Sequence, residues 1–165
     1  AFARLAPRFP EWVLVILGKG PLHHELEGQV IAHGLQNRVI LPGVAGNIGE
    51  WYTRADIYVM SSRFEGFPNT LLEALAHGTP AISFDCLTGP SDIIRHGIDG
   101  LLVPPGDVDA LTEALSQLMG SEELRRRFAQ NAVEARTRFS VENIALLWER
   151  LFEKLIGKGV IDGCG

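Results

Sequence analysis

Short apolar runs that do not alternate with polar residues are the feature that most constrains the fold of this chain. The five runs cover residues 12–17, 39–41, 57–60, 80–84 and 101–103, and each is followed by turn residues and a segment with helical spacing. A strand that is apolar throughout is covered on both faces, which is typical of a parallel sheet with helices on each side. The pattern therefore predicts an α/β fold with a Rossmann-like parallel sheet and flanking helices.

Helical spacing appears between these runs and again after the last of them. Residues 22–34 and 48–55 carry apolar residues three and four positions apart, which predicts two helices. Three further apolar stripes predict a helical C-terminal third. The residues expected to cap these three helices are Asp107, Ser121 and Ser140. A length of 165 residues suits one domain, over residues 1–156, with residues 157–165 as a flexible tail.

Charge and composition exclude several classes of function. The formal net charge of −5 disfavours nucleic acid as a partner, because a phosphate backbone selects a basic surface. No apolar run approaches the roughly 18 residues that span a bilayer, so the cytoplasm is the expected location. Cys86 and Cys164 are 78 positions apart, and neither they nor the five histidines show the spacing of metal ligands. No metal site is therefore expected.

The most informative segment, residues 61–78, joins a predicted strand to a predicted helix. It passes through a loop that contains Gly66 and Pro68, and it begins a helix near Asn69 that ends at Gly78. Ligands of open α/β sheets bind beyond the carboxyl ends of the strands, where a helix N-terminus offers free N–H groups and a partial positive charge. An anion is therefore expected at the start of this helix.

Two carboxylates, Glu65 and Glu73, lie eight positions apart on either side of this helix start. A diphosphate held between them would leave each carboxylate to accept hydrogen bonds from hydroxyls, of a sugar at one end and a ribose at the other. The N–H groups expected to hold it belong to Phe67, Asn69, Thr70 and Leu71. Two plainer roles stay open: Thr70 and Glu73 fit a capping box that only closes the helix, and Glu65 fits a solvated loop residue.

The same segment resembles the E-x(7)-E motif of the family 4 retaining glycosyltransferases, which have the GT-B fold. Glu65-Gly66-Phe67-Pro68 opens the motif, and Glu73-Ala74 closes it. Other blocks resemble the family in the same order, at residues 14–21, 39–43, 55–62, 77–81 and 97–103, so the resemblance covers nearly the whole chain. It implies the C-terminal half of such an enzyme, which binds the nucleotide sugar.

The resemblance also implies a role for each residue of the site. In the family, the first motif Glu contacts hydroxyls of the donor sugar and the second contacts the nucleotide ribose. Glu65 is thereby the candidate catalytic residue and Glu73 the ribose ligand. The backbone between them holds the diphosphate, and the turns after the first two strands lie beside the donor. The implied donor-binding residues are Gly18, Gly20, Gly43, Glu65, Gly66, Phe67, Pro68, Asn69, Thr70, Leu71 and Glu73.

The implied chemistry is glycosyl transfer with retention, without a metal or another cofactor. Cys86, Gly89 and Pro90 resemble a Cys-x-x-Gly-Pro loop of members that build polysaccharides and lipid-linked oligosaccharides from UDP-sugars, although Asp92 stands where that loop usually has Glu. The likeness implies a UDP-sugar as donor and a glycan or lipid-linked acceptor. It also implies peripheral membrane association of the whole enzyme.

The chain departs from the family at its start. Ala1 opens what reads as the second half of a helix, whereas the family's domain begins with a strand that carries an Arg and is followed by a Lys-Gly turn. That first strand is central, so its neighbours are expected to have unpaired edges unless a larger chain or neighbouring copies fill the gap. The N-terminal acceptor-binding domain is also expected to be missing, and the fragment alone is expected to be inactive.

Three other functions fit less well. The turn Gly18-Lys19-Gly20-Pro21 lacks the third glycine of a dinucleotide-binding fingerprint, which disfavours an oxidoreductase. A GT-B sugar-nucleotide epimerase would share the layout, although the family 4 blocks match better. A module that binds a nucleotide sugar without transferring it is the main alternative that is not an enzyme.

Overall fold

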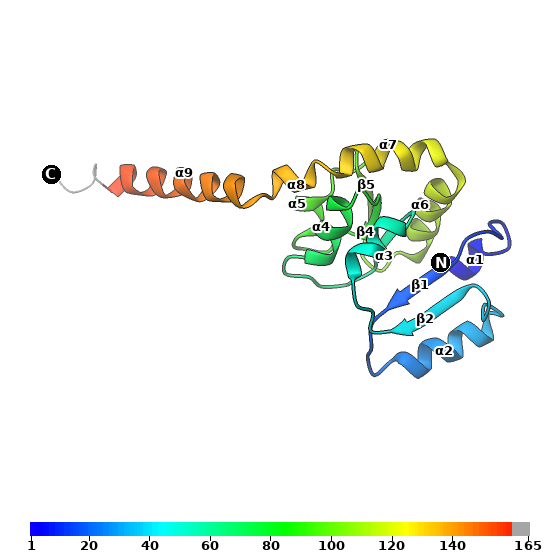
Figure 1. Ribbon diagram of the computed structural model, residues 1–165. Coiled ribbons are helices and arrows are strands. Elements are labelled where there is room, and N and C mark those ends of the chain that lie inside the picture. The colour runs from blue at the N-terminus through cyan, green and yellow to red at the C-terminus, as the bar shows by residue number, and fades with distance from the viewer. Residues whose placement is uncertain (160–165) are drawn as a thin grey trace.

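Five parallel strands form the framework of the protein in the computed structural model, which describes residues 1–159 and, of residues 157–159, only the backbone (Figure 1). The strands are β1 (Leu14–Leu17), β2 (Val39–Gly43), β3 (Tyr58–Met60), β4 (Ala81–Phe84) and β5 (Gly100–Val103). Each strand overlaps one predicted apolar run, and every pair in contact is parallel. The predicted α/β class and parallel pairing are confirmed.

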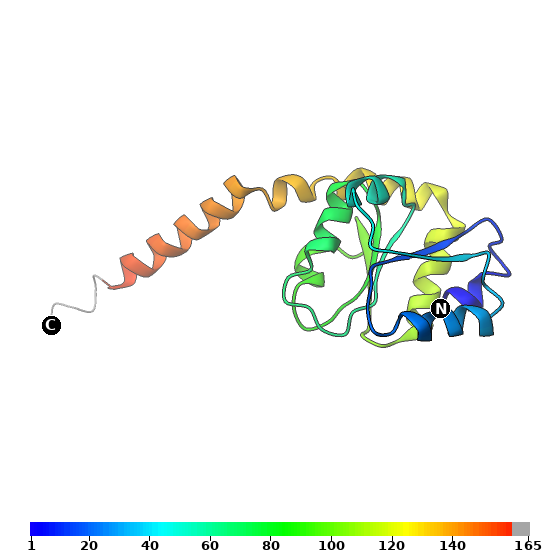
Figure 2. The ribbon, with the colours of Figure 1, turned by 60° about the horizontal axis from the view of Figure 1, so that its bottom comes forward.

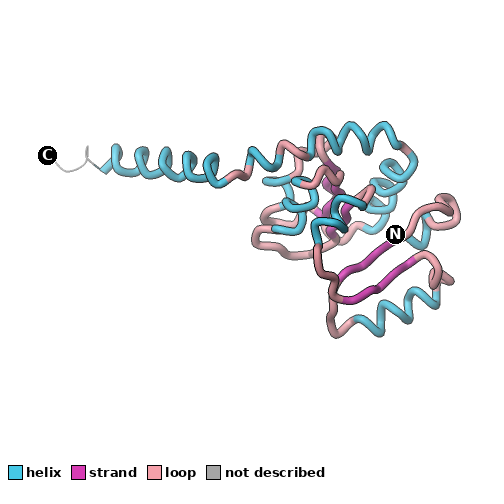
Figure 3. The backbone as a smooth tube through the Cα atoms, in the orientation of Figure 1, coloured by secondary structure: helices cyan, strands magenta, loops and turns pink. Residues whose placement is uncertain are grey.

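The strands are divided between two sheets. β1 pairs with β2, and β4 lies between β3 and β5. In Figures 1 and 3 the β1 strand lies on the side of its pair that faces the three-stranded sheet. The continuous sheet that a Rossmann-like fold implies is thus interrupted between β1 and β3, because no strand among the described residues bridges these two edges.

Nine helices occur in the part of the chain that the structure describes. They are α1 (Phe2–Leu5), α2 (His23–Ala32), α3 (Ile48–Arg54), α4 (Asn69–Ala76), α5 (Pro90–Ile93), α6 (Val108–Gly120), α7 (Glu122–Ala132), α8 (Ala135–Arg138) and α9 (Val141–Gly159). The predicted caps are confirmed. The Asp107 side chain accepts from the Ala110 amide, and the Ser121 and Ser140 hydroxyls accept from amides three residues ahead, at 2.8, 3.1 and 3.2 Å respectively.

Helices cover both faces of the three-stranded sheet. Every residue of β4 is buried, as its apolar run requires. On one face Ile82 packs with Leu118 of α6 and Phe128 of α7. On the other face Ala81 packs with Leu71 of α4. The neighbouring positions 81 and 82 face opposite ways because side chains alternate along a strand.

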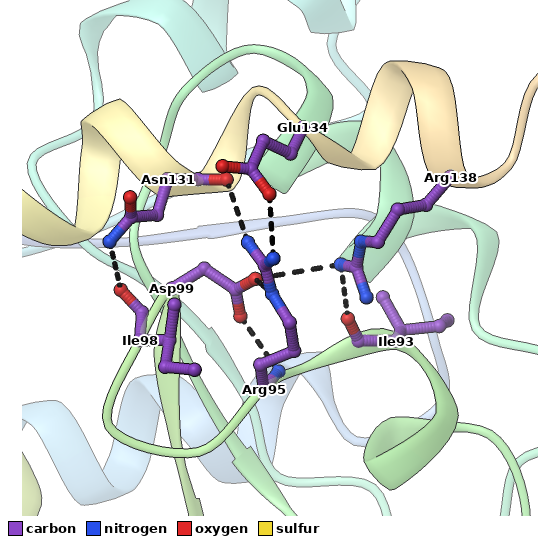
Figure 4. A network of polar contacts seen from close by, with 7 residues as sticks. All are labelled: Ile93, Arg95, Ile98, Asp99, Asn131, Glu134 and Arg138. Atoms are coloured by element: carbon purple, nitrogen blue, oxygen red, sulfur yellow. Dashed lines mark hydrogen bonds and ion pairs between the residues drawn. The ribbon is translucent and has the colours of Figure 1, made fainter.

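A buried carboxylate, Asp99, fastens the turn before β5 to the helices above it (Figure 4). It accepts from the Arg95 amide at 2.8 Å and from the Arg95 guanidinium at 2.7 Å. Arg95 also pairs with Glu134 at 2.6 Å, next to α8. Arg138 of α8 contacts Asp99 at 3.5 Å and donates to the Ile93 carbonyl at 2.7 Å. The network joins α5, β5 and α8.

The two-stranded sheet is attached to the rest through α1. The Arg38 guanidinium, just before β2, donates to the carbonyls of Trp12 and Phe9 at 2.7 and 2.6 Å. It also lies over the Phe2 ring of α1, 5.8 Å from its centroid. α1 in turn packs on α6 through Leu5, which is buried.

The last helix, α9, extends away from the body of the protein (Figures 1 and 2). Its apolar stripe is exposed, with Leu147 57%, Trp148 55% and Leu155 58% accessible. It continues through Gly159, so it includes the first three residues of the tail predicted over 157–165, and the flexibility of that tail stays a prediction. The remainder of that predicted tail, 160–165, lies outside the described residues.

None of the described helices combines the length and the apolar character needed to cross a bilayer.

Candidate functional site

The predicted strand–loop–helix unit forms at the carboxyl end of β3. The chain leaves Met60, passes through the loop and enters α4 at Asn69, as predicted. His77 ends the helix, and Gly78 follows with φ of 83°, a left-handed conformation that glycine adopts without steric cost. Pro68, the residue before the helix, is buried and brings no side-chain acceptor to the first turn.

The four backbone amides predicted to hold a diphosphate are not equivalent. The Asn69 amide donates to the Phe67 carbonyl at 3.0 Å, and the Leu71 amide donates to the Pro68 carbonyl at 3.1 Å. Within the described residues, the amides of Phe67 and Thr70 have no hydrogen-bond acceptor. These two amides are therefore the ones free to donate to a ligand, while the other two shape the turn.

The capping-box interpretation of Glu73 is wrong. A cap at Thr70 would start the helix at Leu71, but α4 starts two residues earlier because Pro68, with its fixed φ, precedes the first helical residue. Glu73 consequently lies in the second turn, not the first, and its carboxylate does not close the helix. Its Oε2 atom instead accepts a hydrogen bond from the Tyr52 hydroxyl at 3.1 Å.

Tyr52, on α3, was not predicted as part of the site. Its place in an apolar stripe identified it only as a core residue, and its side chain is indeed buried, 5% exposed. Burial, and next the charge of Glu73, raise the pKa of Tyr52 well above that of a free phenol. A similar pair lies nearby, where the Tyr58 hydroxyl donates to Thr70 Oγ1 at 2.8 Å and burial raises the pKa of Tyr58.

Glu65 lies in the loop before α4 and is half-buried. Its carboxylate makes no hydrogen bond or ion pair within the described part of the chain, and its backbone carbonyl accepts from the Thr88 hydroxyl. That contact joins the loop after β3 to the loop after β4. The Glu65 carboxylate is thus free to accept hydrogen bonds from a ligand.

The two loops pack closely. Gly89, with φ of 98°, lies against Gly66 and Pro68, and a Cβ atom at this position would overlap the Pro68 ring. The Phe67 ring, 46% exposed, packs edge to face on Phe139 at the end of α8, with 5.9 Å between ring centroids. The loop that carries Glu65 is therefore supported from two sides.

The predicted glycines of the first two strands meet at the carboxyl end of the smaller sheet. The Gly18 amide donates to the Gly43 carbonyl at 2.8 Å, and both residues have positive φ. Gly18 and Gly20 line a shallow pocket of about 270 Å³ together with Ile16, Pro21 and other residues of this turn. No hydrogen bond among the described residues joins this glycine pair to the Glu65–Glu73 segment.

A second hollow, of about 360 Å³, lies beside α3. It is lined by Asn47, Gly49, Glu50, Thr53, Arg54 and His77 and includes none of the predicted site residues. Among the described residues, no group of three or more His, Cys, Asp and Glu side chains lies close enough to hold a metal ion.

The glycine turns after β1 and β2, and the carboxylate-bearing loop that enters a helix after β3, lie at the carboxyl ends of parallel strands in an α/β domain. Residues 1–135 match the family described as Glycosyl transferases, group 1. Because the match covers most of the sequence, the chain belongs to this family, and the family resemblance inferred from its motifs is confirmed.

Individual relatives agree with this assignment. An exopolysaccharide phosphotransferase of Streptomyces coelicolor is 45% identical over 159 residues, which are 96% of this chain but only 17% of that protein. The C-terminal domain of LpcC, a group 1 glycosyl transferase of Francisella tularensis, superimposes with a TM-score of 0.76 at 30% identity, over 83% of this chain and 74% of that domain. HepE of Anabaena in complex with UDP has the same fold, with a TM-score of 0.78 at 24% identity over 88% of this chain and 42% of HepE.

The match to the Francisella domain identifies the part of a glycosyltransferase that this chain represents. It is the C-terminal domain of the GT-B architecture, with its helical C-terminal region, as the motif order predicts.

Proposed function

We propose that this chain is the donor-binding half of a retaining glycosyltransferase, which transfers a sugar from a UDP-sugar to a glycan or lipid-linked acceptor. The observation that carries the proposal is the loop–helix unit after β3, in which Glu65 and Glu73 flank two free amides at a helix start. The presence of UDP in the similarly folded HepE supports a uridine nucleotide. The name of the Streptomyces relative supports polysaccharide synthesis as the setting.

Each part of the unit suits one part of a nucleotide sugar. The free amides of Phe67 and Thr70, at the positive end of the α4 dipole, suit a diphosphate. Glu73 accepts from the ribose hydroxyls, and Glu65 accepts from hydroxyls of the sugar. The glycine turn at Gly18 lies beside the donor, because glycine allows a ligand to approach the backbone closely.

The proposed chemistry needs no metal or other cofactor. Negative charge grows on the departing diphosphate as the sugar–phosphate bond breaks, and preorganised N–H donors stabilise that charge in the transition state. The acceptor binds to the N-terminal domain of the family's enzymes, so the proposal includes no activity for this domain alone. The whole enzyme is proposed to lie in the cytoplasm and to associate peripherally with a membrane.

Calorimetry with UDP and a UDP-sugar tests the proposal, and Glu65→Ala and Glu73→Ala separate its two halves. Glu73→Ala is expected to lower the affinity for UDP and for the UDP-sugar alike, by roughly tenfold, because a pair of hydrogen bonds is lost. Glu65→Ala is expected to lower the affinity for the UDP-sugar but not the affinity for UDP, because only the sugar contacts that carboxylate.

The control is Glu122→Ala, which removes an exposed carboxylate of α7 that, within the described part of the chain, pairs with Arg126 alone, on the surface. The proposal fails if the unsubstituted chain binds neither ligand, or if both site variants bind as the unsubstituted chain does. A stronger affinity for GDP or ADP than for UDP would support the proposed site but contradict the proposal that the donor is a uridine nucleotide.

A second candidate function is a nucleotide-sugar-binding module inside a protein of other chemistry. The observation in its favour is that the Streptomyces relative, at 45% identity, is named a phosphotransferase and is several times longer than this chain. The two candidates differ in the product formed by the whole protein, which is a glycosidic bond for the transferase and none for the module.

A further inference from the structure

We propose that Tyr52 is a positioning residue of the donor site, which holds the Glu73 carboxylate in the orientation that accepts ribose hydroxyls. The inference rests on the proposed function, because it concerns how the same site selects a ribonucleotide.

The first observation is the contact itself. Tyr52 comes from α3 and Glu73 from the second turn of α4, and the phenol oxygen lies 3.1 Å from Glu73 Oε2. Glu73 is otherwise exposed, and a free glutamate side chain samples many rotamers whose loss opposes ligand binding. A fixed donor at one oxygen restricts these rotamers before the ligand arrives, so less entropy is lost on binding.

The second observation is that Tyr52 is itself held in place. Thr79, which is 2% exposed, donates its hydroxyl to the Tyr52 carbonyl at 2.6 Å. The Tyr52 ring packs edge to face on Tyr58, with centroids 5.9 Å apart, and against His77 at 5.5 Å. His77 in turn bonds through Nδ1 to the Glu73 carbonyl at 2.8 Å. The phenol therefore presents its proton from a fixed position.

The chemistry of the pair suits a hydroxyl ligand. An ionised carboxylate accepts hydrogen bonds only, at about four lone-pair sites, so the phenol takes one site on Oε2 and leaves the others, including both on Oε1, for the ribose hydroxyls. Because burial and the Glu73 charge raise the pKa of Tyr52, the phenol keeps its proton throughout the neutral range. It thus acts as a donor to Glu73 and never competes with it as a base.

Tyr58 offers a matched comparison, since the chain has only these two tyrosines. Tyr58 donates to Thr70, three residues before Glu73 on the same helix. Replacement of either tyrosine by phenylalanine removes one hydroxyl and keeps the ring. Only Tyr52→Phe removes a hydrogen bond to Glu73, the carboxylate proposed to bind the ribose.

The test compares UDP with 2′,3′-dideoxy-UDP, which lacks both ribose hydroxyls, by calorimetry on the chain and its two variants. Tyr52→Phe is expected to lower the affinity for UDP about fivefold, the size of one hydrogen bond, and to leave dideoxy-UDP unchanged. Tyr58→Phe is expected to affect both ligands equally. If Tyr52→Phe lowers the affinity for both ligands equally, or for neither, the inference is overturned.

A measurement without ligand separates this inference from the proposed function. A double-mutant cycle of Tyr52→Phe with Glu73→Ala in urea unfolding is expected to show coupling of about fivefold in the unfolding equilibrium, whereas Tyr58→Phe with Glu73→Ala is expected to be additive. Additivity of the first pair overturns the inference even if UDP binds. Coupling in a chain that binds no UDP refutes the proposed function, and the ribose role with it, while the Tyr52–Glu73 contact stands.

Discussion

The close approach of two loops at Gly89 shows how single residues build the candidate site. A Cβ atom there would overlap the Pro68 ring and lie 3.2 Å from the Gly66 carbonyl oxygen, and the φ of 98° disfavours every residue with a side chain. The Cys-x-x-Gly-Pro pattern thus has a structural meaning here, because its glycine lets the loop after β4 support the loop that carries Glu65.

Gly89→Ala is expected to destabilise the chain by about 2–4 kcal/mol, the sum of a left-handed alanine and an overlap with a rigid ring. The measurement is urea unfolding, with Gly106→Ala as the control. Gly106 has a similar φ of 77°, but nothing lies near its Cβ position, so it carries the backbone penalty alone. Equal losses at the two positions would show that the loops do not press on Gly89.

At the scale of elements, the start of α4 decides which groups face a ligand. A capping box and a helix with Pro68 before its first residue differ by only two positions, yet they give Glu73 different roles. The sequence Thr70-Leu71-Leu72-Glu73 is compatible both with a helix capped at Thr70 and with a helix that begins at Asn69. The structure distinguishes them because a tyrosine from another helix, 21 positions earlier, supplies the partner of the Glu73 carboxylate.

The turn before β5 depends on a buried ion pair. Asp99→Asn is expected to lower the free energy of unfolding by about 3 kcal/mol, because it leaves Arg95 and Arg138 next to a neutral group in a site where the acid is fully buried. Urea unfolding measures the loss. Arg126→Ala, which breaks a pair whose side chains are 76% and 65% exposed, is expected to cost less than about 1 kcal/mol. Similar losses in the two variants would contradict the buried role of Asp99.

At the scale of the whole molecule, the notable feature is the break between the two sheets. β1 and β3 each have one edge without a partner strand among the described residues, and Val15 of β1 is 36% exposed. We propose that a parallel strand from the preceding part of a longer chain completes the sheet, and that neighbouring copies occupy the gap when that strand is lacking.

This proposal predicts that the 165-residue chain associates in a concentration-dependent manner, which sedimentation velocity measures. Val15→Lys is expected to weaken the association, because a charge at a strand edge opposes pairing. Leu151→Lys on α9 is the comparison, since that helix also carries exposed apolar side chains and Leu151 is 43% accessible. A chain that stays monomeric at high concentration, or that responds only to Leu151→Lys, would contradict the proposal.

The sequence by itself determined the strands, most helices and the family, because these depend on local patterns: apolar runs, caps and motif spacing within a few residues. It also placed Glu65 and Glu73 on one segment. Only the tertiary structure decided that Tyr52 donates a hydrogen bond to Glu73 and that Phe67 and Thr70 keep their amides free. Each of these features depends on groups that are distant in the chain or on a turn geometry that several local patterns share, and such contacts arise only when the chain packs.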